Sequence, residues 1–154
     1  MSGPAARLIE AALAAGAGDE TPVHGRTVAV GWATVETERA IESLASDLHI
    51  SPAAFLFAPD SEALGARCVV ARGVLPGGGA LVVLEAATEG LLAATLARHD
   101  EGPRVVWLAP DGPATIVATR PSLGPFGPER LLPGPATDGL RRLLVSFPPG
   151  TIRG

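Results

Sequence analysis

Residues 65–109 constrain the fold more than any other stretch, because short apolar runs follow one another there with only turn residues between them. Such runs bounded by Gly and Pro are typical of buried strands. The Pro-Gly-Gly-Gly turn at 76–79 suits a backbone with positive φ and predicts a tight link between two strands. Thr88 begins a short helix that Gly102 ends. The strands are expected at 67–74, 80–86 and 104–109.

A strand and an amphipathic helix are predicted upstream of that stretch. Residues 26–33 alternate in the way that a half-buried strand does. An apolar stripe at helical spacing follows, and Thr34 or Thr37 can cap this helix. The stripe consists of Ile41, Leu44 and Leu48. The combined order is β-α-β-β(-β) followed by the first strand of a second unit, which indicates an α+β fold.

The two ends of the chain carry weaker signals. A helix is expected to begin at Pro4 and to end near Gly16, docked on the surface rather than acting as a secretion signal. Residues 121–139 are rich in Gly and Pro and predict no regular element. The remaining expected elements are an apolar loop or edge strand at 55–57, a strand at 114–119 and a short helix or strand at 138–147.

Composition limits the class of protein. Of the 154 residues 47% are hydrophobic, and the mean hydropathy is +0.31. No window of about 18 residues is free of charges and Gly or Pro breaks, so no membrane span is predicted. The apolar surplus predicts a buried subunit interface and hence a homo-oligomer. A net charge of −4 leaves no basic stripe for nucleic acid.

The single cysteine, Cys68, is expected to be a small buried hydrophobe in a reducing cytoplasm.

Three phrases of the chain resemble a known superfamily. The phrases are VGWATVETERA, ALVVLEAATEGLLAATLARH and EGPRVVWLA, within about residues 26–110. They are similar to the vicinal oxygen chelate (glyoxalase-like) superfamily, and in pattern most of all to the methylmalonyl-CoA epimerase family. The resemblance implies an α+β fold of paired βαβββ modules, here with a degenerate second module and an extra N-terminal helix. The expected organisation is an N-terminal helix and joint at 1–21 and a single domain at 22–154, with modules at 22–100 and 101–154.

The superfamily typically holds a divalent metal between its modules with His and Glu or Gln side chains. In this sequence the first His position falls on Val30, or on Ala29 if the register slips by one residue. The carboxylate position falls on Val82 and the second His position on Val105. An aliphatic side chain has no lone pair for a metal, and His24, His49 and His99 lie elsewhere in the pattern. The departures from the family pattern therefore predict a protein without metal or other cofactor.

The two tryptophans stand at matching places in the two modules. Side chains at i and i+2 of a strand share a face, so Trp32 should share the face of Val30, and Trp107 that of Val105. This alignment predicts that both indoles point into the cleft between the modules. The expected ligand-binding residues are Trp32, Trp107, Arg67, Arg72 and Arg104, with the arginines at the rim to pair with a carboxylate or phosphate.

Three functions remain open at this point. The leading hypothesis is a metal-free protein that binds a small aromatic or acyl ligand in the cleft. The alternatives are a lyase, isomerase or epimerase of the same superfamily, and an interaction protein whose cleft is closed by the tryptophans. Glu85 is expected to face away from the cleft as a partnered carboxylate at a strand end. No convergent acid–base pair can be assembled from the sequence, so no catalytic residue is assigned and an enzyme is not favoured.

Overall fold

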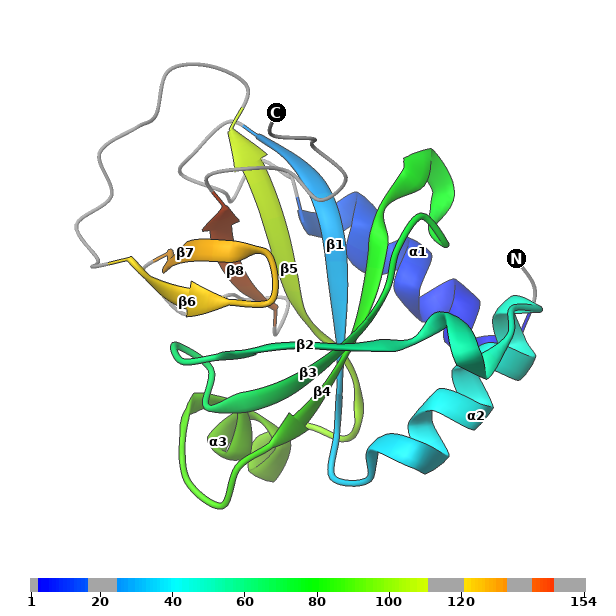
Figure 1. Cartoon of the computed structure of the whole chain (residues 1–154), viewed down its shortest axis with the longest axis horizontal. Coiled ribbons are helices and arrows are strands. Elements are labelled where there is room, and N and C mark those ends of the chain that lie inside the picture. Colours follow the sequence, from blue (N-terminus) through cyan, green and yellow to red (C-terminus); the bar gives the residue numbers. More distant parts are fainter. Residues whose placement is uncertain (1–2, 17–24, 111–120, 133–139, 146–154) are drawn as a thin grey trace.

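One mixed sheet of eight strands organises the described part of the chain, and three α-helices pack against it (Figure 1). The computed structural model describes residues 3–16, 25–110, 121–132 and 140–145. In chain order the elements are α1 (Pro4–Gly16), β1 (Gly25–Thr34), α2 (Thr37–Leu48), β2 (Leu56–Ser61), β3 (Ala66–Ala71), β4 (Ala80–Ala86), α3 (Leu91–Arg98), β5 (Gly102–Pro110), β6 (Ser122–Gly124), β7 (Gly127–Leu131) and β8 (Arg141–Val145), with single 3₁₀ turns η1 (Pro52–Ala54) and η2 (Pro76–Gly78). No helix within these ranges is long and apolar enough to cross a membrane.

The two halves of the sheet repeat the same arrangement. The strand order is β2-β3-β4-β1-β5-β8-β7-β6. In each half the first strand pairs parallel with the last, as β1 does with β4 and β5 with β8. The remaining pairs, β2–β3, β3–β4, β6–β7 and β7–β8, are antiparallel. Antiparallel pairing of β1 with β5 joins the halves. The predicted α+β fold of paired modules with an N-terminal helix is therefore confirmed.

Two apolar layers lie on opposite sides of this sheet. The outer face is the side covered by α1 and α2, where Val30, Leu81 and Val106 belong to one core cluster with Ile9 and Leu44 of the helices. The inner face is the other side, and α3 contributes to it. Its buried residues include Ala29, Val82, Leu84, Val105, Trp107 and Leu143. Because successive side chains of a strand point to opposite faces, one apolar strand contributes residues to both layers.

The two edge strands, β2 and β6, lie next to each other, although they stand at opposite ends of the strand order. Figure 1 shows β6 alongside part of β2, and the backbone N–H of Glu62 donates to the carbonyl of Leu123 at 3.0 Å. The sheet thus curves until its two halves face each other across the inner layer. The apolar segment expected at 55–57 contributes Leu56 and Phe57 to the edge strand β2, and the segment expected at 138–147 contributes β8.

Two local predictions were wrong. Residues 121–139 were expected to be irregular, but they contain β6 and β7, because the residues Gly124 to Gly127 form a turn with φ +96° at Gly127. Neither threonine caps α2 with its side chain. Thr37 is the first helical residue, and the carboxylate of Glu85 from β4 accepts its backbone N–H instead. The strand expected at 114–119 lies outside the described residues.

Candidate functional site

The inner face carries a large aromatic side chain at its centre. Trp107 is fully buried there, and its Nε1–H donates to Oε1 of Glu129 (β7) at 2.9 Å. The hydroxyl of Ser61 (β2) donates to the other carboxylate oxygen at 2.7 Å. The ring of Phe126 lies edge-on to Trp107, with centroids 5.6 Å apart, and the guanidinium of Arg72 lies 5.5 Å from the Phe126 centroid. These five residues, the inner cluster, connect the two halves of the sheet.

Glu129 is the most unusual member of the inner cluster, because it is a carboxylate only 1% exposed in an apolar layer. Burial raises its pKa above the ordinary value, and the hydrogen bonds from Trp107 and Ser61 oppose that rise. A Cβ atom on Gly124 would collide with the Glu129 carboxylate, so β6 needs glycine at this point. Burial, with a smaller contribution from the Glu129 charge, raises the pKa of the nearby Cys68 thiol to about 12. Cys68 is therefore a buried, protonated thiol, as predicted.

The two tryptophans do not share a cleft, so this part of the prediction was wrong. Trp32 is half-buried against the outer core cluster, whereas Trp107 lies in the inner one. Alternation holds along β5 and from Ala29 onward in β1, but the β1–β5 pairing places Ala29 opposite Trp107, and opposed residues share a face. The register between β1 and β5 shifts on each side of this pair, between Thr27 and Ala29 and between Gly31 and Trp32. Ala29, and not Val30, therefore occupies the inner position of β1.

The three predicted rim arginines are also divided between the faces. Arg72 lies at the rim of the inner face, over Phe126. Arg67 lies on the outer side of β3, and its guanidinium pairs with the carboxylate of Glu85 at 3.7 Å. Arg104 donates from Nε and Nη2 to the carbonyl oxygen of Asp100 at 3.0 and 2.8 Å. Of the five residues predicted to bind a ligand, the structure brings together only Trp107 and Arg72.

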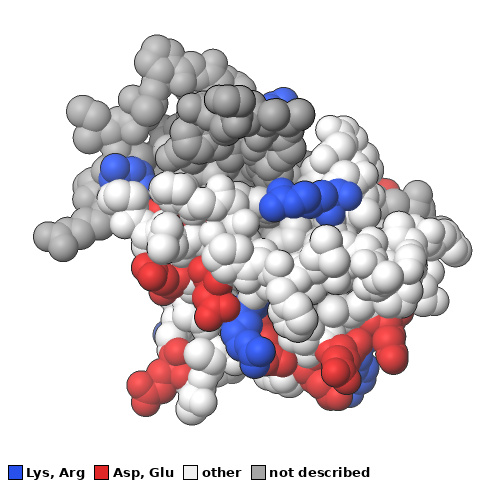
Figure 2. Space-filling model, in the orientation of Figure 1, with Lys and Arg blue, Asp and Glu red and all other residues white. Residues whose placement is uncertain are grey.

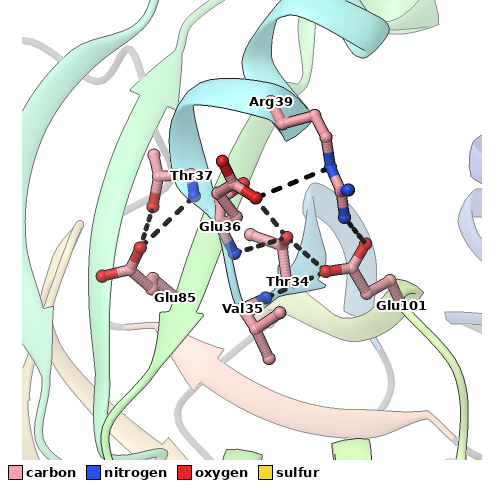
Figure 3. Close-up of polar contacts among 7 residues, drawn as sticks. All are labelled: Thr34, Val35, Glu36, Thr37, Arg39, Glu85 and Glu101. Atoms are coloured by element: carbon pink, nitrogen blue, oxygen red, sulfur yellow. Dashed lines mark hydrogen bonds and ion pairs between the residues drawn. The ribbon is translucent and has the colours of Figure 1, made fainter.

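A hollow of about 400 Å³ lies on the other side of β3, between β2 and the start of α2. It is lined by Glu36, Thr37, Glu38, Phe57, Ala58, Asp60, Arg67, Cys68, Val69 and Glu85. Glu85 accepts hydrogen bonds from the backbone N–H of Thr37 at 3.3 Å and from its hydroxyl at 3.0 Å (Figure 3). The prediction that Glu85 faces away from Val82 as a partnered carboxylate is thus confirmed.

The same close-up shows how the β1–α2 connection is fixed (Figure 3). Glu101 accepts from the hydroxyl of Thr34 at 2.7 Å and from the N–H of Val35 at 3.0 Å. These hydrogen bonds, the backbone one first, lower the pKa of Glu101. Arg39 lies 3.9 Å from Glu101 and 3.8 Å from Glu36. These carboxylates position the start of α2, so they have a structural role.

The described residues of the inner face offer few ligands for a divalent metal ion. Of the positions expected from the sequence resemblance, Val82, Val105 and the alternative first position Ala29 lie on the inner face, buried and aliphatic, whereas Val30 lies on the outer face. Glu129 offers a single carboxylate there, and both its oxygens already accept hydrogen bonds. Across the described ranges, no three His, Cys, Asp or Glu side chains are grouped closely enough to hold an ion.

Replacing Gly31 with alanine should show how closely Trp107 fills the inner face. A Cβ atom at Gly31 would lie 2.6 Å from Leu84 Cδ1 and 2.8 Å from Trp107 Cζ3. Overpacking of this kind costs about 1–3 kcal/mol, which urea denaturation can measure. Combining Gly31→Ala with Trp107→Phe should cost less than the sum of the two single changes, because the smaller ring leaves room. Strict additivity would show that the two residues do not compete for space.

Sequence reasoning missed Glu129, Ser61 and Phe126. Glu129 and Phe126 lie in the segment that was expected to be irregular, and a lone glutamate among Pro, Gly and Arg carries no signal of burial. The only available clue was the Gly-Pro-Phe-Gly phrase at 124–127, whose turn residues are typical of a hairpin. Recognising that hairpin would have predicted the strand β7. Alternation of side chains along β7 would then have placed Glu129 on the inner face.

The fold is that of the glyoxalase-like proteins of the vicinal oxygen chelate superfamily, as the sequence resemblance implied. Among solved structures, methylmalonyl-CoA epimerase in complex with methylmalonyl-CoA and NH4+ has a TM-score of 0.60 and 16% identity, over 78% of this chain and 92% of that one. The epimerase from Mycobacterium tuberculosis gives 0.58 and 14%, over 79% and 87%. A hypothetical protein from Bacillus halodurans gives 0.59 and 14%, over 78% and 92%. No family model and no curated protein matches the sequence.

Proposed function

We propose that the protein binds a small acyl or aromatic molecule, without a metal ion, at the inner face between the two halves of the sheet. The observation that carries the proposal is the inner cluster, in which one buried carboxyl group and two aromatic rings converge beneath an exposed arginine. Apolar sites with a few convergent polar groups and a perturbed pKa are typical of ligand pockets. Structures of methylmalonyl-CoA epimerase in complex with methylmalonyl-CoA and with 2-nitronate-propionyl-CoA support an acyl ligand on this fold.

Each member of the inner cluster has a role in this proposal. A raised pKa keeps Glu129 protonated over a wider pH range, and a protonated carboxyl donates a hydrogen bond to an acyl carbonyl oxygen. Trp107 and Phe126 supply the apolar walls. Arg72 provides the charge that pairs with a phosphate or carboxylate of the ligand. Phe126 and Arg72 are the more exposed members, so the ligand enters by displacing the Phe126 ring.

Ligand binding is tested with Trp32→Phe as the background, so that Trp107 alone reports fluorescence. Propionyl-CoA and benzoate should quench or shift the Trp107 emission in a saturable way, and CoA alone separates the acyl contribution from that of the nucleotide. Arg72→Ala should weaken binding of an anionic ligand at least about tenfold, since a charge-assisted hydrogen bond contributes about 1.5–3 kcal/mol. Arg67→Ala, on β3 beside the outer hollow, should leave it unchanged.

Two results would contradict this function. A flat response to every ligand would favour the closed interaction protein, an alternative supported by the complete burial of Trp107. A divalent ion bound to each chain, after purification without chelator, would contradict the metal-free part of the proposal. The predicted homo-oligomer is checked in the same samples by their mass in solution.

An epimerase or isomerase is the second candidate, favoured by one observation. A buried carboxyl group with a raised pKa suits general-base removal of a proton next to a thioester carbonyl. Incubation of propionyl-CoA with the protein in D2O should then add deuterium at the α-carbon, and Glu129→Gln should abolish the exchange. Binding without deuterium uptake would support the binder over the enzyme.

A further inference from the structure

Within the described ranges, β3 is the strand that pairs with residues 56–58 of the edge strand β2, and exposed apolar side chains lie there. Leu56 and Phe57 are 67% and 87% exposed, although they lie in a strand that pairs with β3 on its other side. The backbone hydrogen bond between β2 and β6 is made from Glu62, at the far end. Pro59 has no N–H to donate, so it adds no donor for a partner strand beyond residues 56–58. This accessible edge, residues 56–58, is the kind of edge to which extended peptides add as a further strand.

Charge decides which partner this edge suits. The outer hollow begins beside Phe57, and the carboxylates of Glu36, Glu38, Asp60 and Glu85 line it together with one guanidinium, that of Arg67. In Figure 2 acidic side chains lie along the lower part of the face in view, with basic side chains between some of them. A second copy of this chain would bring a second acidic hollow close to the first, and such like-charge juxtaposition is unfavourable. A basic partner gains attraction at the same place.

We propose that the edge of β2 and the adjoining outer hollow dock an extended, basic peptide segment of a partner protein. The segment adds as a strand along residues 56–58, with an apolar group against Leu56 on one face and the stem of an arginine or lysine against Phe57 on the face of the hollow. Side chains of a strand alternate between faces, so Arg or Lys residues at every second position reach the carboxylates of the hollow. The short edge limits pairing to a few residues and predicts micromolar affinity. This surface shares no residue with the inner cluster, so it goes beyond the proposed ligand-binding function.

The test uses the full chain and the capped peptide acetyl-Arg-Val-Arg-Val-Arg-amide. Titration calorimetry should give a micromolar Kd that rises with salt. Methylating the peptide's valine nitrogens keeps the charge but removes strand donors, and should weaken binding at least about tenfold. Phe57→Ser should weaken it similarly, as should the combination of Glu38→Gln with Asp60→Asn, whereas Leu8→Ser and Glu10→Gln on α1 should have no effect.

Three results would overturn the proposal. One is absence of binding at millimolar peptide. The second is affinity that depends on charge alone, unchanged by N-methylation and by Phe57→Ser. The third is a concentration-dependent dimer in sedimentation experiments that Phe57→Ser abolishes, because a second copy of the chain would then occupy the edge.

Discussion

Replacing Trp107 with alanine should destabilise the protein by about 3–5 kcal/mol. The indole is fully buried at the centre of the inner face, where its removal leaves a large cavity. It also removes the Nε1–H that Glu129 accepts at 2.9 Å and the ring against which Phe126 packs. Losing the donor leaves a buried carboxylate with one partner fewer, which adds to the cost. Chemical denaturation followed by circular dichroism measures the change.

Trp32→Ala is the matched control, because it removes the same side chain from the other face. Trp32 is only half-buried, and it packs against the outer core cluster from the edge of that layer. The loss should therefore be clearly smaller than for Trp107. Trp107→Phe separates packing from hydrogen bonding, since it keeps most of the ring and loses the donor, at a cost of about 1–3 kcal/mol. Equal losses for Trp32→Ala and Trp107→Ala would contradict the difference in burial between the two indoles.

Wild-type stability should fall relative to that of Glu129→Gln as the pH rises above 4.5. The folded-state pKa of Glu129 is raised above its ordinary value of 4.5, so the unfolded chain releases this proton at a lower pH than the folded chain. Between the two pKa values the folded state binds more protons, and the free energy of unfolding decreases by at most about 1.4 kcal/mol per pH unit. The glutamine side chain of the variant has no proton to release, so the variant lacks this dependence.

The comparison between the two proteins isolates Glu129 from other titrating groups. Glu101, whose pKa is lowered, contributes stability above its unfolded pKa and loses it as the pH falls, but it does so equally in both proteins. Cys68 begins to matter only above pH 9, the ordinary pKa of its thiol, so measurements from about pH 4 to 8 avoid it. A constant difference in unfolding free energy across this range would contradict the raised pKa.

Local patterns predicted most of the fold. The Gly-rich turn, the helical stripe of α2 and the apolar strands were all recognisable, because each depends on residues that are neighbours in the chain. The hairpin of β6 and β7 was missed, because its strands are short and interrupted by Pro and Gly. The cap of α2 was missed for another reason. The carboxylate that accepts the Thr37 N–H comes from Glu85, far away in the sequence.

The candidate site shows the same division between local and long-range information. The sequence by itself determined that Trp32 shares a face with Val30 and that Trp107 shares a face with Val105. Only the tertiary structure decided which of these faces meet. Pairing β1 with β5 one residue away from the expected register places Trp32 and Trp107 on opposite faces of the sheet. Likewise, Glu129 became the polar centre of the inner face only when curvature of the sheet brought β7 to Ser61 on β2. Alternation is a property of one strand, whereas register and curvature depend on contacts between residues that are distant in the chain.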